Sequence, residues 1–165
     1  MLSKGKINSR GFTIVELLIV IVVIAILAAI SIVAYNGIQD RARFTSYQTD
    51  LSNIRKAILM YYIDNGKYPV TPSDSWLGWD QATGDSFIPG LSPNYMSKIP
   101  QMNSALPPSD TYLYTSVSGG TGYTLQRWKS DGLPAIERIN NPRIKSTDTS
   151  AWGYWTSGVA ANPSD

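Results

Sequence analysis

The feature that most constrains this chain is an unbroken apolar run of 14 residues, Leu17–Ile30. It lies within residues 14–34, of which only Glu16 and Ser31 are polar. A helix of about 20 residues rises about 30 Å, which is the thickness of a bilayer core. Inside a bilayer any other backbone conformation leaves polar groups unpaired, which is costly. The run therefore predicts one helix that is long enough to span a membrane.

Positive charge is concentrated just before this run. Lys4, Lys6 and Arg10 stand in a segment without acids, whereas from residue 12 onward there are 11 basic and 12 acidic side chains. The net charge of +2 thus belongs to the N-terminal segment and does not indicate a nucleic-acid-binding surface. Because positive charge is retained on the cytoplasmic side, we expect residues 1–11 to stay there and the rest to cross.

Two residue types are missing from the 165 residues, cysteine and histidine. The lack of cysteine excludes a disulfide framework, a Cys-ligated metal site and a thiol nucleophile. The lack of histidine removes the usual general base and the commonest metal ligand. We therefore expect neither an enzyme nor a bound cofactor.

The apolar run has two ordinary explanations. One is a secretory signal peptide, for which Ala29 and Ser31 are placed for cleavage, and the other is a plain membrane anchor. Neither accounts for Glu16, since a carboxylate within an apolar helix costs about 2–3 kcal/mol at the bilayer centre and less near an end. Such a residue usually marks a functional contact.

A third explanation accounts for the acid. Residues 11–17, with the sequence GFTIVEL, resemble the processing site of type IV pilins and pseudopilins, and the resemblance extends from residue 1 to about residue 69. It implies that a membrane prepilin peptidase cuts between Gly11 and Phe12 and that Phe12 becomes the N-methylated terminus. It also implies that Glu16 is the assembly residue, pairing with the terminal amine of a neighbouring subunit. The residues alone leave open that the amine is its own.

The resemblance implies a structural subunit of a type IV pilus or related filament, with a role such as adhesion or motility. Its partners would be identical or related pilin subunits, the peptidase and methyltransferase, the pilus assembly machinery and, before assembly, membrane lipid. The precursor would lie in the cytoplasmic membrane and the filament at the cell surface. Two alternatives stay open: a pseudopilin of a type II secretion or DNA-uptake system, and a membrane-anchored extracytoplasmic binding module.

The helical pattern continues beyond the apolar run. Large apolar residues recur there at spacings of three and four, as an amphipathic stripe: Phe44, Tyr47, Leu51, Ile54, Ile58 and Tyr61. With no proline inside it and Asn65-Gly66 as its stop, one helix is predicted over residues 12–65. We expect the stripe to pack on a sheet rather than in a coiled coil. Gly37 is either a weak point where this helix bends or melts on assembly, or a site of close helix packing.

The rest of the chain has the composition of an irregular connection followed by strands. Residues 66–108 hold seven of the ten prolines, and we expect a short helix near residues 91–98. The glycine-rich residues 118–122 indicate a hairpin between two strands. The runs with strand-like composition are 111–117, 123–129, 135–139 and 151–156.

The expected fold class is therefore α+β, with a long N-terminal helix packed on a small antiparallel sheet of three or four strands. We expect five segments along the chain. They are a leader that is removed (1–11), the transmembrane and filament-core half of the helix (12–34), its amphipathic half (35–65), the Pro-rich connection (66–110), and the sheet with the C-terminal tail (111–165).

Three weaker patterns have ordinary explanations that we prefer. Three loop acids lack the spacing of a calcium-binding loop: Asp74, Asp80 and Asp85. A basic stretch suits a solubilised sheet edge better than nucleic-acid binding: Arg127, Lys129, Arg138, Arg143 and Lys145. Three aromatic residues suit packing onto the sheet better than an adhesive or intersubunit patch: Trp152, Tyr154 and Trp155.

Overall fold

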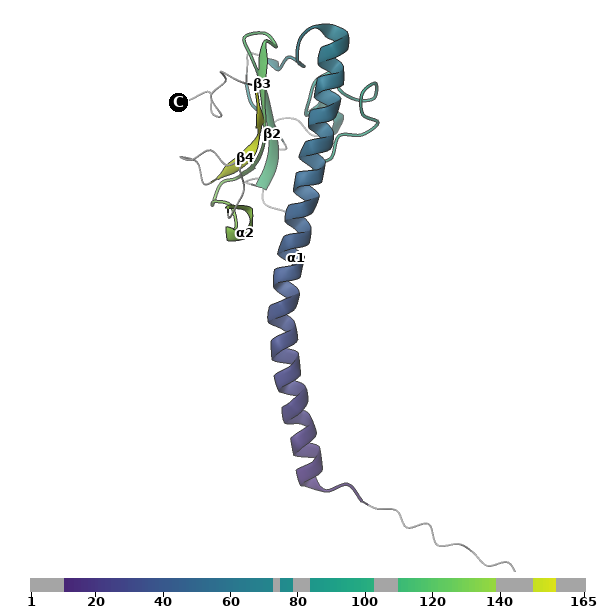
Figure 1. Cartoon of the computed structure of the whole chain (residues 1–165), viewed down its shortest axis with the longest axis vertical. Coiled ribbons are helices and arrows are strands. Elements are labelled where there is room, and N and C mark those ends of the chain that lie inside the picture. Colours follow the sequence, from purple (N-terminus) through teal and green to yellow (C-terminus); the bar gives the residue numbers. More distant parts are fainter. Residues whose placement is uncertain (1–10, 73–74, 79–83, 103–109, 139–149, 157–165) are drawn as a thin grey trace, which may run out of the picture. The chain divides into compact units, whose positions relative to one another are not determined.

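The computed structural model describes residues 11–72, 75–78, 84–102, 110–138 and 150–156. Its longest element is α1 (Ile14–Asn65), an α-helix of 52 residues (Figure 1). The elements that follow are β1 (Leu77–Gly78), the 3₁₀ helix η2 (Gly84–Ser86), β2 (Asp110–Val117), β3 (Gly122–Lys129), α2 (Ala135–Arg138) and β4 (Ala151–Trp155). The chain divides into two compact units, Met1–Arg41 and Ala42–Asp165, and we call the second unit the head.

Both ends of α1 are set by local signals in the sequence. The helix begins at Ile14, two residues after the predicted start, because Thr13 caps it rather than joining it. It ends at Asn65, as predicted, because Gly66 has a φ of 68° and its N–H donates to the carbonyl of Tyr62 at 2.8 Å. Glycine adopts this left-handed conformation without a Cβ penalty, which is why it terminates helices so often.

The head contains one four-stranded antiparallel sheet with the strand order β1-β2-β3-β4. Strands β2 and β3 form the predicted hairpin, paired from Asp110 with Lys129 to Val117 with Gly122. Strand β4 pairs with β3 from Ala151 with Trp128 to Trp155 with Thr124. Together with α1, this sheet confirms the predicted α+β class.

Two predicted elements are wrong. Residues 135–139 were expected as a strand, but residues 135–138 form the short helix α2, whose turn closes with the N–H of Glu137 donating to the carbonyl of Pro134 at 2.9 Å. Proline favours this outcome because its fixed φ suits the start of a helix. The helix expected near residues 91–98 is replaced by turns and bends, which follow Gly90 in the left-handed conformation with a φ of 75°.

The fourth strand comes from a place where none was predicted. Leu77 and Gly78 pair with Tyr114 and Leu113 of β2, in a strand of only two residues. Such a short strand carries no hydrophobic alternation, so the sequence gives no sign of it.

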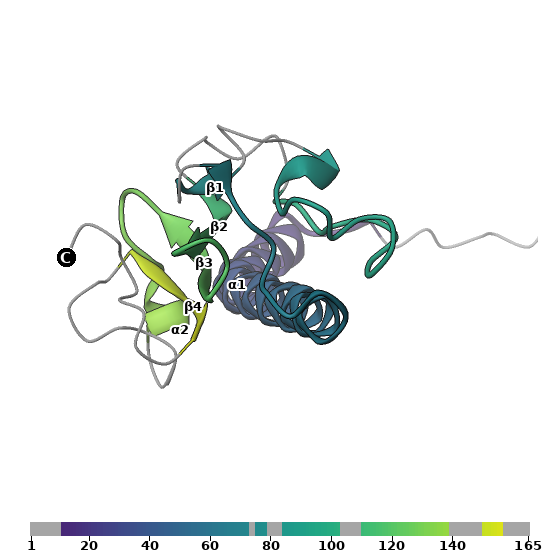
Figure 2. The ribbon, with the colours of Figure 1, turned by 90° about the horizontal axis from the view of Figure 1, so that it is seen from above.

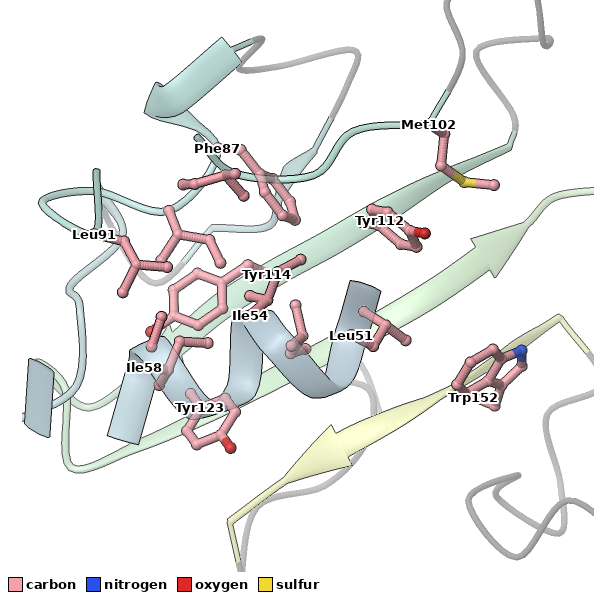
Figure 3. Close-up of a cluster of buried hydrophobic side chains, with 14 of the residues drawn as sticks. Leu51, Ile54, Ile58, Phe87, Leu91, Met102, Tyr112, Tyr114, Tyr123 and Trp152 are labelled. Carbon is pink, nitrogen blue, oxygen red and sulfur yellow. The ribbon is translucent and has the colours of Figure 1, made fainter. Parts of the chain in front are cut away.

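The core of the head lies between α1, the sheet and the connecting segment (Figures 2 and 3). From the amphipathic stripe, Leu51, Ile54 and Ile58 are fully buried, while Phe44, Tyr47 and Tyr61 are partly buried against the same core. The sheet contributes Tyr112, Tyr114, Tyr123, Leu125 and Trp152. The Pro-rich connection between α1 and β2 contributes Phe87, Ile88, Leu91, Ile99 and Met102.

Candidate processing and assembly site

The predicted cleavage site lies just outside the helix. Gly11 and Phe12 precede α1, have no regular secondary structure and are exposed, with the Phe12 side chain 76% exposed. Among the described residues, a Cβ atom at position 11 would meet nothing within 4 Å. The described part of the fold therefore does not require glycine at position 11.

Thr13 and Glu16 form a capping box at the start of α1. The carboxylate oxygen Oε2 of Glu16 accepts hydrogen bonds from the Thr13 N–H and from the Thr13 hydroxyl, both at 2.8 Å. In return the Glu16 N–H donates to Thr13 Oγ1 at 3.1 Å. The box gives partners to N–H groups that have none within the helix. Glu16 thus has a structural role in its own helix.

The sequence-based interpretation missed this role, although a signal for it was present. Thr13 is followed three residues later by Glu16, and an apolar run begins at once. The pattern Thr-x-x-Glu before an apolar run is the signature of a capping box. The residue to add to the predicted set is therefore Thr13, as the partner of Glu16 in the helix cap.

The capping box leaves the second carboxylate oxygen of Glu16 available. In the described part of the chain, Oε1 has no hydrogen-bond partner. A carboxylate has about four acceptor positions on its two oxygens. Glu16 can therefore keep its bonds to Thr13 through Oε2 and accept an ammonium group through Oε1.

The helix that starts at this site presents an uncovered apolar surface. Among the described residues, α1 is the one helix long and apolar enough to cross a membrane: the window Ile14–Ser31 has a mean hydropathy of 3.1, and none of it is buried. Its side chains are about half exposed or more, from 47% at Val20 to 85% at Ile14. The hydroxyl of Ser31 donates to the carbonyl of Leu27 at 2.8 Å, so it needs no outside partner.

Gly37 lies within α1, which continues through it without interruption. A Cβ atom at this position would meet nothing within 4 Å, so none of the described residues requires glycine there. A role for Gly37 as a weak point on assembly stays a prediction.

The acidic and basic residues of the two weaker sequence patterns are described only in part. Asp85 accepts a hydrogen bond from the N–H of Ile99 at 3.1 Å, while Asp74 and Asp80 lie outside the described residues. No group of three acidic side chains able to hold a metal occurs within the part of the chain that the structure describes. From the basic stretch, Arg127 is 1% exposed and paired with acids, and Lys129 is paired with Asp131. Arg138 is exposed, whereas Arg143 and Lys145 lie outside the described residues.

The three C-terminal aromatic residues belong to β4 and differ in exposure. Trp152 is 1% exposed and meets Phe44 edge-on, with ring centroids 5.6 Å apart. Tyr154 is half-buried, and the guanidinium of Arg55 lies 4.9 Å from its ring centroid. Trp155 is 38% exposed. Two of the three are thus packed on the head.

Comparison with known proteins agrees with this geometry. Residues 6–32 match the family model described as the prokaryotic N-terminal methylation motif. Among similar proteins, the chain is 31% identical over 88 residues to type II secretion system core protein G of Escherichia coli. It is 46% identical over 61 residues to the major component of the type IV wide pilus of Thermus thermophilus. It is 37% identical over 60 residues to a type IV major pilin of Neisseria gonorrhoeae.

The N-terminal part of the chain is thus similar to proteins of the type IV pilin and pseudopilin family. The three matches cover 53%, 37% and 36% of this chain, in the order given, and 58%, 47% and 36% of the relatives. The chain thus spans little more than half, at most, of these pilin-family proteins. No solved structure gave a significant match.

Proposed function

We propose that this chain is a structural subunit of a pilin-type filament and is held in a membrane by its N-terminal helix before assembly. One observation carries the proposal: the apolar first half of α1 is uncovered in a molecule whose head has a complete core of its own. Apolar surface of this extent is unstable in water. Lipid covers it before assembly, and the helices of neighbouring subunits cover it in the filament.

Processing would prepare the end of this helix. A prepilin peptidase cuts the exposed bond between Gly11 and Phe12, and the new amino group of Phe12 is methylated and keeps its positive charge. The capping box survives the cut, because the Thr13 N–H is an amide both before and after it. The mature chain therefore begins with an ammonium group at Phe12 and, four residues on, carries the carboxylate of Glu16.

Glu16 would register each incoming subunit through Oε1. In an apolar environment a charge pair is screened far less than in water, so an ammonium group of a neighbouring subunit is strongly attracted there. A buried carboxylate without such a partner is unfavourable, which disfavours subunits docked out of register. The partners are pilin subunits of the same or a related kind, the processing enzyme and the assembly machinery.

A pseudopilin of a secretion system is the second candidate within the same class. It is supported by the similarity of the chain to type II secretion system core protein G. The chain is also similar to major pilins. Both kinds of subunit share the features of the N-terminal helix, so the head and the genetic setting distinguish them. A membrane-anchored binding module, whose helix never assembles, is the alternative of another class.

The test is mass spectrometry of the chain purified from sheared filaments. We expect loss of residues 1–11 and one added methyl group on Phe12. The variant Gly11→Leu should keep its leader, because a bulky side chain beside the cut bond obstructs the peptidase, whereas a Cβ atom at this position meets nothing within 4 Å among the described residues. Gly11→Ala is the matched control and should be cleaved at least in part. An intact leader on wild-type protein from filaments would rule out the proposal.

A further inference from the structure

The head contains a cavity of about 310 Å³ that is lined by α1, by the end of the Pro-rich connection and by β2, and we call it the hollow. Small-molecule sites in proteins occupy about 300–1,000 Å³, so the hollow has room for a small ligand. Its buried wall is largely apolar. Met102 is 7% exposed and Tyr112 is 3% exposed, and Figure 3 shows both side chains at the same end of the core.

The helix α1 supplies the charged wall of the hollow. Arg43, Ser46, Tyr47 and Asp50 line it, and they occupy positions i, i+3, i+4 and i+7, which lie on one face of a helix. Seven residues of helix separate the Cα atoms of Arg43 and Asp50 by about 10 Å along the axis. The hollow therefore has a cation at one end of this wall and an anion at the other.

These two charges are not neutralised by partners within the described part of the chain. Arg43 makes no hydrogen bond or ion pair there. Asp50 accepts one hydrogen bond, from the hydroxyl of Tyr112 to Oδ2 at 2.9 Å, and its Oδ1 has no described partner. The side chains of Ser46 and Gln101, which also line the hollow, make no hydrogen bond with described residues. The hollow thus has unused donors and acceptors beside its two charges.

The separated charges discriminate between classes of ligand. A phosphate would pair with the guanidinium of Arg43 but would be repelled by the carboxylate of Asp50, and for a simple cation the two effects are reversed. A zwitterion satisfies both groups, and such complementarity gives a site its specificity. An extended peptide spans at most about 3.3–3.6 Å per residue, so about three residues cover the distance between the charges.

We propose that the hollow binds a short peptide of about three residues with free ends. The peptide carboxylate pairs with the guanidinium of Arg43, which can bind it through two parallel hydrogen bonds. The peptide ammonium group pairs with Oδ1 of Asp50. The peptide amides bond to Ser46 and Gln101, and its backbone packs on Met102. The site lies in the head and does not depend on whether the chain assembles into a filament.

Triglycine is the simplest probe for this site. It is titrated into the full chain in detergent micelles, and the amide chemical shifts of the head are followed. For a ligand of this size we expect a dissociation constant of about 1 mM. N-acetyl-triglycine lacks the ammonium group, and triglycine amide lacks the carboxylate. Each should bind about tenfold more weakly than triglycine, because each loses one charge-assisted contact.

Arg43→Gln and Asp50→Asn form a matched pair of variants. Arg43→Gln should weaken the binding of triglycine and N-acetyl-triglycine about tenfold and leave that of triglycine amide unchanged, since Arg43 contacts only the carboxylate. Asp50→Asn keeps an acceptor for the hydroxyl of Tyr112. It should weaken the binding of triglycine and triglycine amide but not that of N-acetyl-triglycine. Lys56→Gln removes an exposed cation of α1 that does not line the hollow, so this control should bind like wild type.

This crossed pattern of losses, with saturable shifts at the residues of the hollow, would support the peptide site. The proposal is overturned if triglycine gives no saturable shift at about ten times the expected dissociation constant. It is also overturned if either capped probe binds as well as triglycine, because the hollow then does not recognise both ends. If Lys56→Gln weakens binding as much as Arg43→Gln, unspecific attraction of charges explains the shifts and the site is again overturned.

Discussion

At the residue scale, Glu16 has two separable properties, the charge of its carboxylate and its place in the capping box with Thr13. A leucine at this position removes both. A glutamine removes the charge but keeps an acceptor for Thr13, because a capping box takes either Glu or Gln at this position. The two variants therefore distinguish pairing between subunits from the start of the helix.

We expect Glu16→Leu to insert into the membrane as well as wild type and to be cleaved after Gly11, because neither the apolar run nor the cut site is changed. Filament yield should fall sharply. The filament yield of Glu16→Gln should fall as far, because the contact that recruits a subunit needs the charge. Membrane fractionation, a cleavage blot and a sheared-filament preparation measure all three steps. Normal filaments from the Gln variant would mean that the cap, not the charge, matters for assembly.

Gly153 is a position where the fold itself requires glycine. A Cβ atom there would lie 2.0 Å from the carbonyl oxygen of Leu125 and 2.6 Å from Cα of Gln126. Gly153→Ala should therefore lower the free energy of unfolding of the head by about 2 kcal/mol or more, as for other overpacked sites. Thermal unfolding measures the loss. Gly37→Ala is the control, since a Cβ atom at Gly37 meets nothing within 4 Å, and it should leave the head unchanged.

At the scale of elements, β2 and β3 turn tyrosines toward α1, and the hydroxyls of the β2 tyrosines have partners. Tyr112 donates to Oδ2 of Asp50 at 2.9 Å, and Tyr114 donates to the carbonyl of Pro69 at 2.7 Å. Burial raises the pKa of Tyr112, Tyr114 and Tyr123 above the usual value of 10.0. Each buried hydroxyl is thus held in its neutral form.

These pKa shifts predict an alkaline limit to the stability of the head. A raised pKa stabilises the folded state fully below the unfolded value, about 10, and the stabilisation is lost as pH rises above it. The part of the phenolate absorbance that comes from these three tyrosines should therefore rise in one cooperative step with unfolding, and circular dichroism should change in the same step. Tyr114→Phe should make the stability of the head less dependent on pH above 10. Ionisation of these tyrosines in a head that stays folded would contradict the argument.

At the scale of the whole molecule, the predicted parts are those with a local signal in the sequence. The apolar run is unbroken, the stripe from Phe44 to Tyr61 repeats at spacings of three and four, and the hairpin is marked by the glycine-rich residues 118–122. The two-residue strand β1 and the helix α2 have no period. Their conformations depend on partners far along the chain, such as Tyr114 for Leu77 and Trp152 for Glu137.

Individual residues, like the elements, fall into those that a local sequence motif indicates and those that it does not. A local motif indicates Gly11, Phe12 and Glu16. The same motif contains Thr13, whose capping role could have been predicted from it. Arg127 was not predicted: its neighbours in the sequence, Gln126 and Trp128, do not indicate its burial, which depends on the contacts of β3 with β2, α2 and α1. The spacing of basic residues in a sequence does not indicate which of their side chains are buried.

The head has its own core, and this predicts that it folds without the apolar half of α1. Every buried core residue lies between Leu51 and Trp152, and none comes from the window Ile14–Ser31. A protein that begins at about residue 35 should be soluble and monomeric, with mixed α/β circular dichroism and a cooperative thermal transition. Its near-ultraviolet spectrum should match that of the full chain in micelles, because the same aromatic pairs are present. A disordered product would mean that the sheet needs the filament or the membrane half in order to form.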